Sequence, residues 1–228
     1  LTNMSHDIRT PMNAILGITR LMENEQHLSD KMRGYIRKAH ASGQHMLALI
    51  NDVLDMSKIE AAEIRIVSEP VSLAELTWQI EGIIRLHADE KEQDFVVRVH
   101  DIAHEFLIGD SVRLNQVLIN LLTNANKFTE QGRITLSFEV LEKEGMVRFA
   151  VADTGCGIPP EKQAKVFDRF EKLDEFKQGT GLGLAICRQI AVIIGGRIWV
   201  DPTYTGGARF IFAHPLDIGT GRKGRKGK

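Results

Sequence analysis

Cysteine is scarce in this sequence, because only Cys156 and Cys187 occur in 228 residues and they form no CxxC pair. Two isolated cysteines cannot build a disulfide framework or a cysteine-rich metal centre. Such sparing use is typical of a protein from a reducing compartment. The sequence also lacks an apolar run of about 18 residues and the pattern of a secretory signal peptide. It therefore predicts a globular chain with no membrane-spanning helix of its own.

An excess of charge of either sign is missing as well, since the formal net charge is -1 at pH 7. With this balance, the chain as a whole predicts neither nucleic acid nor a membrane surface as a partner. Basic groups gather only at the end, where the last seven residues, RKGRKGK, include five Lys or Arg. Such a glycine-spaced run is typical of a flexible tail, which we assign to residues 219–228. The alternative, a nucleic-acid-binding arm, is disfavoured by the overall charge.

Proline and glycine are rare in residues 1–61, which contain one proline and three glycines. Their apolar residues recur at helical spacing, and NEQHLSDK interrupts the pattern, with Ser29 or Asp30 suited to cap a second helix. These features predict a helical hairpin. Because two helices alone cannot cover both apolar stripes, we expect two copies to form a dimeric four-helix bundle. A hairpin packed against its own second half is the alternative, which fits such long stripes less well.

From residue 62 the sequence alternates between short strand-like segments and amphipathic helices. Alternating polarity predicts strands at 62–68, 94–100, 133–143, 145–153, 197–201 and 207–215. Helical periodicity predicts helices at 72–91, 109–128 and 181–196. Ser72 and either Asp110 or Ser111 are suited as N-caps, and Gly195 as a left-handed C-terminal cap. The mixture predicts an α+β chain whose second part is one sheet covered by helices on one face, with Trp78 and Trp199 in the core.

The stretch NMSHDIRTPMNAI places a histidine, an acid and a proline close together on the first predicted helix. One interpretation makes His6 a nucleophile, Asp7 its base and Pro11 a hinge, because proline removes a helical N–H and opposes the carbonyl of Asp7. The other interpretation is a surface histidine near a kink.

Two glycine-rich stretches, DTGCGI at 153–158 and GTGLGL at 179–184, each lead into a predicted helix start. Glycine there lets phosphate oxygens approach the free backbone N–H groups at the positive end of the helix dipole. Neither stretch is GxGxxG or GxxxxGK[ST], so dinucleotide and Walker-type binding are disfavoured. Either stretch alone is typical of a turn, but the ordered pair indicates a nucleotide.

The segment NLLTNANKF places Asn120 and Asn124 four residues apart and Lys127 on nearly the same helical face. Amides with a lysine can hold a hard cation and the phosphates that the cation bridges. A solvated helix face is the simpler interpretation of these three residues taken alone.

Five motifs occur in order along the chain: MSHDIRTPMNAI, NQVLINLLTNANKFT, DTGCGI, FDRF and GTGLGL. In this order they resemble the H, N, first-glycine, F and second-glycine boxes of the sensor histidine kinases, and the resemblance covers nearly the whole chain. It implies a dimerisation and phosphotransfer domain at residues 1–61. A catalytic ATP-binding domain of the Bergerat (GHKL) type, an α/β sandwich shared with DNA gyrase, mismatch-repair and chaperone ATPases, would follow at 62–218.

The resemblance assigns three catalytic positions to the first helix. His6 matches the phosphoacceptor, and Asp7 matches the acid that orients the imidazole and accepts its proton. Neutral imidazole is available at pH 7 because its unperturbed pKa is about 6.5. Thr10 matches a position that serves the reverse reaction, in which water attacks the phosphoaspartate of the partner.

In the ATP-binding domain the resemblance assigns Asn124 to Mg²⁺, with Asn120 and Lys127 as supporting nucleotide contacts. Asp153 matches the carboxylate that reads the adenine amino group, and Gly155 and Gly157 match positions that let the base approach.

The phosphate side of the nucleotide is assigned to a glycine loop and a lid. The loop residues are Gly179, Gly181 and Gly183, and Lys172 matches a phosphate contact. Phe167 and Phe170 are interpreted as packing anchors of a lid, whose segment 171–178 is short for the family.

The resemblance therefore implies that the chain phosphorylates its own His6 with ATP and Mg²⁺. The phosphoryl group would then pass to an aspartate of a response regulator. Phosphatase activity on that regulator is also compatible with the resemblance. The expected partners are a second copy of the chain and a receiver domain. A membrane is expected only through other parts of a longer parent, so the chain would be the cytoplasmic portion of a membrane-anchored sensor.

Two rival functions stay open. A Bergerat ATPase that uses hydrolysis for conformational work is disfavoured, because such enzymes carry a water-activating Glu four residues before the magnesium Asn and this chain has Asn120 there. A degenerate kinase, acting as a dimeric scaffold or only as a phosphatase, is disfavoured by the complete set of motifs.

Overall fold

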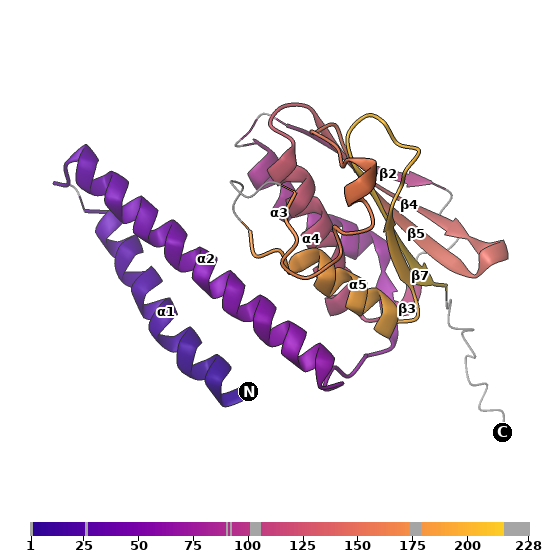
Figure 1. Ribbon diagram of the computed structural model, residues 1–228, viewed down its shortest axis with the longest axis horizontal. Coiled ribbons are helices and arrows are strands. Elements are labelled where there is room, and N and C mark those ends of the chain that lie inside the picture. Colours follow the sequence, from indigo (N-terminus) through magenta and orange to yellow (C-terminus); the bar gives the residue numbers. More distant parts are fainter. Residues whose placement is uncertain are drawn as a thin grey trace, which may run out of the picture. The chain divides into compact units, whose positions relative to one another are not determined.

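The computed structural model, which describes residues 2–25, 27–89, 91, 93–100, 106–173 and 179–216, divides into two units (Figure 1). The first unit comprises the residues up to Ile64 together with a short segment that ends at Leu182. The second unit contains the other residues from Arg65 onward. Each unit has its own buried apolar residues.

The first unit is a helical hairpin of α1 (Thr2–Glu23) and α2 (Asp30–Glu60), as predicted. Ser29 caps α2, because its side-chain oxygen accepts a hydrogen bond from the Met32 backbone N–H at 3.3 Å. α1 continues through Pro11 rather than ending there. None of the described helices combines the length and the apolar character that crossing a membrane requires.

The two helices meet along a narrow seam. Met12 and Ile36 are buried there. Gly43 permits close contact, because a Cβ at this position would lie 3.0 Å from the Leu16 side chain. Many large apolar side chains of the hairpin are nevertheless exposed: Ile8, Ile15, Ile18, Leu21, Met22, Met32, Tyr35, Met46 and Val53. The hairpin therefore presents a long apolar surface that its own seam does not cover.

The second unit is built on a five-stranded sheet with the strand order β2-β4-β5-β7-β6. The strands are β2 (Asp94–His100), β4 (Arg133–Leu141), β5 (Met146–Asp153), β6 (Arg197–Val200) and β7 (Arg209–Pro215). β2 runs parallel to β4, and the other neighbours are antiparallel. Short 3₁₀ turns, η1 (Glu142–Glu144) and η2 (Pro160–Lys162), follow β4 and the loop after β5.

Helices cover one face of this sheet, which confirms the predicted α/β sandwich (Figure 1). They are α3 (Leu73–Asp89), α4 (Ser111–Phe128) and α5 (Gly183–Ile193). The inward-facing aromatic side chains Phe138, Phe149 and Phe212 form the centre of the core, with ring centroids 5.9 and 5.8 Å apart along the row. Such rings contribute packing beyond their buried area.

The strand predicted at 62–68 is wrong, because these residues are not paired in a sheet. Its alternating polarity reflects an irregular segment in which Ile64 and Ile66 are half-buried, and the Val67 backbone N–H donates to Asp110 at 3.1 Å. The strand that does form, β1 (Glu69–Ser72), pairs antiparallel with β3 (Phe106–Gly109) in a separate two-stranded sheet.

The prediction that both tryptophans belong to the core is wrong for Trp78, whose side chain is 77% exposed. The helix α3 buries Leu76 and Ile80 toward the sheet, and Trp78 lies midway between them, on the opposite side of the helix. The prediction is wrong for Trp199 as well, because this side chain is half-buried on the sheet face away from the helices.

Replacing Asp110 by alanine tests how strongly α4 depends on its predicted cap. Its carboxylate accepts hydrogen bonds from the backbone N–H groups of Arg113 and Val67, both at 3.1 Å. We expect Asp110→Ala to lose about 2 kcal/mol of unfolding free energy. Urea denaturation followed by tryptophan fluorescence measures this, because both tryptophans lie in the second unit.

Asp94→Ala is the matched control. The Asp94 carboxylate is exposed and its ion pair with Arg133 has a length of 2.9 Å. Such a surface pair is worth less than about 1 kcal/mol. Equal losses in the two variants would contradict the capping role of Asp110.

Candidate functional site

Asp153, at the end of β5, is a carboxylate with only 3% of its surface exposed. Its Oδ1 accepts hydrogen bonds from the backbone N–H of Gly155 at 2.9 Å and of Ala208 at 3.1 Å. Burial raises the pKa of the Asp153 carboxyl, and the two N–H donors partly offset this rise. Among the described residues none donates to Oδ2, so this oxygen can accept a hydrogen bond from a ligand.

Backbone segments approach Asp153 so closely that glycine is required around it. A Cβ at Gly155 would lie 2.4 Å from the carbonyl oxygen of Phe128, and a Cβ at Gly207 would lie 2.2 Å from the carbonyl oxygen of Asp153. Gly157 has a φ of +72° and Gly207 a φ of +151°, both in the region that favours glycine. The resemblance assigned Gly155 and Gly157 to the approach of a base, and the structure shows a different requirement for them, the packing of the chain itself.

The predicted amide and lysine positions lie on α4, whose last residue, Phe128, contacts the loop after Asp153. Asn120, Asn124 and Lys127 are all half-buried. The Asn120 carboxamide lies near the start of α5, since a Cβ at Gly183 would be 3.8 Å from it. The first N–H groups of α5 have no partner within the helix and attract anions. The structure therefore brings Asn120 together with the start of α5 at Gly183.

A buried glutamine that the sequence reasoning missed fixes the end of α4. Gln93 donates through Nε2 to the backbone carbonyls of Asn126, at 3.2 Å, and Thr129. Its Oε1 accepts from the Asn126 side chain at 2.8 Å, and Lys91 donates to the Asn126 carbonyl at 2.6 Å. These bonds satisfy carbonyl groups that the helix end leaves open. Nothing in the local sequence pattern distinguishes Gln93 from an exposed polar residue.

A second missed contact comes from the turn between β6 and β7. The Tyr204 hydroxyl donates to the backbone carbonyl of Asp153 at 3.2 Å, and the following residues Gly207 and Ala208 pack on the same aspartate. The dipeptide of Gly206 and Gly207 was the available signal, because paired glycines before a strand often mark a close backbone approach.

The phosphate-side glycines are divided between the two units. Gly179 and Gly181 have φ values of +158° and +73° and fall in the segment that clusters with the hairpin. Gly183 begins α5 in the second unit. The structure thus associates Gly183 with Asn120.

The predicted lid anchors behave differently from each other. Phe167 is buried and packs edge-on against Phe210, with 6.1 Å between ring centroids, which confirms it as an anchor. Phe170 is 67% exposed with a φ of +63°, so its assignment as an anchor is wrong. Lys172 is exposed beside it, and residues 174–178 of the predicted lid lie outside the described residues.

The predicted catalytic positions His6, Asp7 and Thr10 all lie within α1. Residues four apart share one face of a helix, so His6 and Thr10 lie on the same side. Thr10 is exposed, and the side chains of His6 and Asp7 lie outside the described part of the chain.

The residues around Asn124 offer carboxamide oxygens to a bound Mg²⁺ and a basic side chain to the phosphates that it bridges. The described residues contain no group of three or more His, Cys, Asp or Glu side chains that could hold a metal ion. Mg²⁺ does not need such a cage, because it commonly takes one or two protein oxygens and completes its shell with phosphates and water. A half-buried carboxamide beside a basic side chain, as at Asn124 and Lys127, fits that mode.

Two protein-family models match the chain. The His Kinase A (phospho-acceptor) domain matches residues 1–62. The histidine kinase-, DNA gyrase B-, and HSP90-like ATPase matches residues 109–218. All predicted site residues fall within these two ranges.

Curated relatives cover nearly all of the chain. The autoinducer 2 sensor kinase/phosphatase LuxQ of Vibrio cholerae is 34% identical over 224 residues, which are 96% of this chain and 26% of LuxQ. The circadian input-output histidine kinase CikA of Synechococcus elongatus is 38% identical over 218 residues, which are 92% of this chain and 29% of CikA. The chain therefore spans less than a third of the length of these relatives.

Solved structures match as well. Full-length ShkA in complex with AMPPNP has a TM-score of 0.80 and 36% identity, covering 95% of this chain and 45% of ShkA. Histidine kinase ThkA in complex with the response regulator protein TrrA has a TM-score of 0.67 and 28% identity, covering 95% of this chain and 60% of that one.

Replacing Asp153 by asparagine tests how much the buried negative charge of Asp153 lowers the stability of the fold. Because the folded-state pKa is raised, Asp153 favours folding when protonated and loses that contribution as the pH rises through the raised pKa. Asparagine stays neutral, and its Oδ1 can accept the same two N–H groups. We expect Asp153→Asn to be at least as stable as the parent at pH 7, with its advantage vanishing as the pH falls below 3.8. Urea denaturation across this pH range measures the difference.

Asp201→Asn is the control of opposite sign. The hydrogen bond from the Thr203 hydroxyl lowers the pKa of Asp201, so its carboxylate stabilises the fold above the ordinary value and loses that effect as the pH falls. Asp201→Asn should therefore be less stable than the parent at pH 7. The same sign of pH dependence in both variants would contradict this account of Asp153.

Proposed function

The chain belongs to the sensor histidine kinases, and from this membership we propose that it is a kinase core that phosphorylates its own His6 with ATP and passes the phosphoryl group to an aspartate of a response regulator. The observation that carries the proposal is the buried carboxylate of Asp153, which keeps one oxygen available beside the end of α4. A site that reads adenine needs such an acceptor.

The nucleotide is the phosphoryl donor, and the second unit holds it. The Oδ2 atom of Asp153 accepts a hydrogen bond from the adenine amino group, with Gly155 and Gly157 against the base. Asn120 and the N-terminus of α5 at Gly183 face the phosphate side, where free N–H groups favour negative charge.

Charge on the transferred phosphoryl group has to be balanced for transfer to proceed. Asn124 would hold a Mg²⁺ ion, which when bound neutralises phosphate charge and aligns the phosphoryl group. Lys127 supplies a fixed positive charge next to it. Gly179, Gly181 and Lys172 complete the phosphate side in this proposal.

The acceptor side of the reaction lies on α1. A ring nitrogen of His6 bonds to the γ-phosphorus, the bond from this phosphorus to the β–γ bridging oxygen breaks, and ADP leaves. Asp7 accepts the proton as positive charge develops on the imidazole. The phosphoryl group then moves from His6 to a carboxylate oxygen of the regulator, and the N–P bond breaks. Thr10, one turn further along, serves the phosphatase reaction by orienting water.

ATP hydrolysis as the main activity is disfavoured by the residue at position 120. Its carboxamide cannot accept a proton from water, unlike a glutamate at this place. The proton acceptor of the proposed reaction stands beside His6 instead, which directs the phosphoryl group to the histidine.

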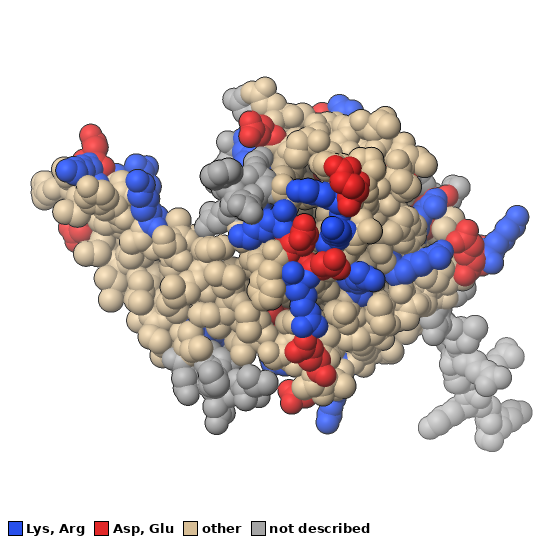
Figure 2. Space-filling model, in the orientation of Figure 1, with Lys and Arg blue, Asp and Glu red and all other residues tan. Residues whose placement is uncertain are grey.

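We extend the proposal to the assembly. Exposed apolar side chains recur every seven residues on both helices of the hairpin: Ile8, Ile15 and Met22 on α1, and Met32, Ala39, Met46 and Val53 on α2. Figure 2 shows that the visible surface of the hairpin is mostly uncharged away from its tip. Heptad spacing of this kind is the pattern of helices that pack in a bundle. A second copy covers these stripes in a four-helix bundle of two hairpins.

The proposed domains are 1–61 for dimerisation and phosphotransfer and 62–218 for ATP binding, with 219–228 as a basic tail. Because the chain spans 26% of LuxQ and 29% of CikA, we place it as the kinase part of a longer sensor protein.

Labelling with γ-labelled ATP and Mg²⁺ tests the reaction. We expect acid-labile, alkali-stable label on the parent chain. His6→Ala should abolish it because the acceptor is lost, and Asn124→Ala should reduce it at least about a hundredfold, since phosphoryl transfer depends on alignment and charge neutralisation. Scintillation counting of the labelled chain and of released phosphate measures both activities.

Two substitutions serve as matched controls for labelling. His27→Ala removes an exposed histidine outside the motif, and Asn115→Ala removes another amide of α4, which bonds Gln79 at 3.3 Å. Both should keep the label. Steady phosphate release that His6→Ala leaves unchanged, with no labelled protein, would overturn the kinase in favour of the ATPase.

Introducing a charge into the exposed heptad stripe tests the dimer. We expect Ile15→Glu to weaken self-association at least about tenfold, because it buries a carboxylate between two copies. Sedimentation equilibrium measures the dissociation constant.

Val112→Glu is the control for self-association, since Val112 is similarly exposed but lies on α4. It should leave the dissociation constant unchanged. A monomeric parent, or equal weakening by both variants, would contradict the proposed bundle.

A further inference from the structure

The face of the five-stranded sheet that points away from the helices carries a groove of about 620 Å³. Its floor lies on the central strands, where the outward-facing residues are small: Thr135 and Ser137 of β4, and Ala150 and Ala152 of β5. Ile211 of β7 continues the floor. Small side chains between larger neighbours leave room for a chain to lie against the sheet.

Arginines surround this floor. Arg98, Arg133, Arg148 and Arg209 line the groove together with the aromatic side chains of Trp199 and Tyr204. Among the described residues that line the groove, two are carboxylates, Glu139 and Asp201. The groove is therefore locally basic, although the formal net charge of the whole chain is -1.

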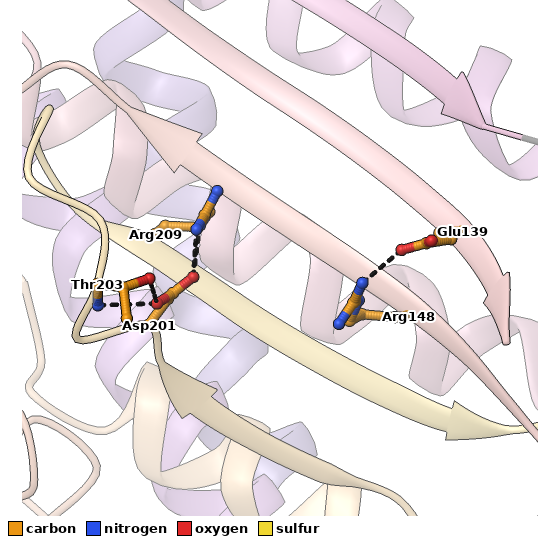
Figure 3. Close-up of polar contacts among 5 residues, drawn as sticks. All are labelled: Glu139, Arg148, Asp201, Thr203 and Arg209. Carbon is orange, nitrogen blue, oxygen red and sulfur yellow. Dashed lines mark hydrogen bonds and ion pairs between the residues drawn. The ribbon is translucent and has the colours of Figure 1, made fainter. Parts of the chain in front are cut away.

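Neighbouring acids hold three of the four guanidinium groups in place. Figure 3 shows Arg148 paired with Glu139, and Arg209 with Asp201, which Thr203 also bonds. Arg133 pairs with Asp94 at 2.9 Å.

Arg98 makes no hydrogen bond or ion pair with any other described residue. The paired arginines keep further N–H donors, because a guanidinium has five. The groove thus combines oriented donors with one arginine, Arg98, that pairs with no acid among the described residues.

The spacing of the arginines suits an extended chain. Arg98 of β2 and Arg209 of β7 are separated by three strand spacings in the sheet order, which is about 14 Å. An extended peptide advances about 3.3 Å per residue, so acidic side chains about four residues apart would reach both.

We propose that this groove is a docking site for an extended acidic peptide segment of a partner protein. We choose an acidic peptide as the occupant because of charge complementarity: each of its separate carboxylates can pair with one arginine. A nucleic acid fits less well. Glu139 and Asp201 lie among the arginines and repel a continuous run of phosphates.

Fluorescence anisotropy with the full chain tests the proposal at about 50 mM salt, where exposed charges are weakly screened. The probes are a labelled ten-residue peptide of alternating Ser and Glu, its Ser–Gln counterpart, and a ten-nucleotide oligothymidylate. We expect the Ser–Glu peptide to bind at least about tenfold more tightly than the Ser–Gln peptide.

Variants separate the groove from the basic tail, which also attracts acids. The double variant Arg98→Ser, Arg148→Ser should weaken Ser–Glu binding about tenfold. The double variant Arg222→Ser, Lys223→Ser removes the same charge from the tail and should change it less than about twofold. Ala150→Phe fills the floor without changing charge and should also weaken binding.

Circular dichroism confirms that each variant is folded. The proposal is overturned if the tail variant weakens peptide binding as much as the groove variant, or if Ala150→Phe has no effect. It is equally overturned if the parent does not distinguish the two peptides, or if oligothymidylate binds more tightly than the Ser–Glu peptide and the groove variant abolishes that binding.

Discussion

The second unit depends on a single arrangement: a carboxylate removed from water at the end of a central strand, with one oxygen bound and one available. Burying an ionisable group is costly unless neighbouring donors compensate. At Asp153 the compensation comes from the backbone of Gly155 and Ala208. Because these donors belong to the chain itself, the side chain is oriented before any ligand arrives, and a ligand need not spend binding free energy on ordering it.

The same arrangement explains why the surroundings of Asp153 are formed by main chain. The carbonyl of Phe128 leaves no space for a Cβ at Gly155, so the loop after β5 rests directly on the end of α4. Gln93 in turn holds that helix end through the carbonyls of Asn126 and Thr129. The Asp153 carboxylate at the end of β5 and the C-terminal end of α4 are thereby held in a fixed arrangement.

Features that depend on residues close together in the sequence could be predicted, whereas contacts between residues far apart in the sequence could not. Each of the caps Ser29 and Asp110 was one of two adjacent residues that the sequence offered, because a cap depends on the three residues that follow it. Asp153 was assigned through the resemblance to the sensor histidine kinases, which its motif DTGCGI helps to carry. Gln93 could not be predicted, since its partners lie more than 30 residues away and burial of one amide leaves no periodic pattern. The prediction that Trp78 is buried was wrong for a related reason. Tryptophan is often buried, but the position of a residue on the helix decides whether its side chain faces the core.

The turn between β6 and β7 joins two surfaces that the sequence gives no reason to connect. Tyr204 stacks beside the Arg209 guanidinium, 4.9 Å from its ring centroid, and so forms part of the wall of the outer groove. The Tyr204 hydroxyl also donates a hydrogen bond to the backbone carbonyl of Asp153. A displacement of this tyrosine from the groove must therefore act on the backbone that positions the buried carboxylate. If the two surfaces bind different ligands, linkage requires that each ligand alter the affinity of the other by the same factor.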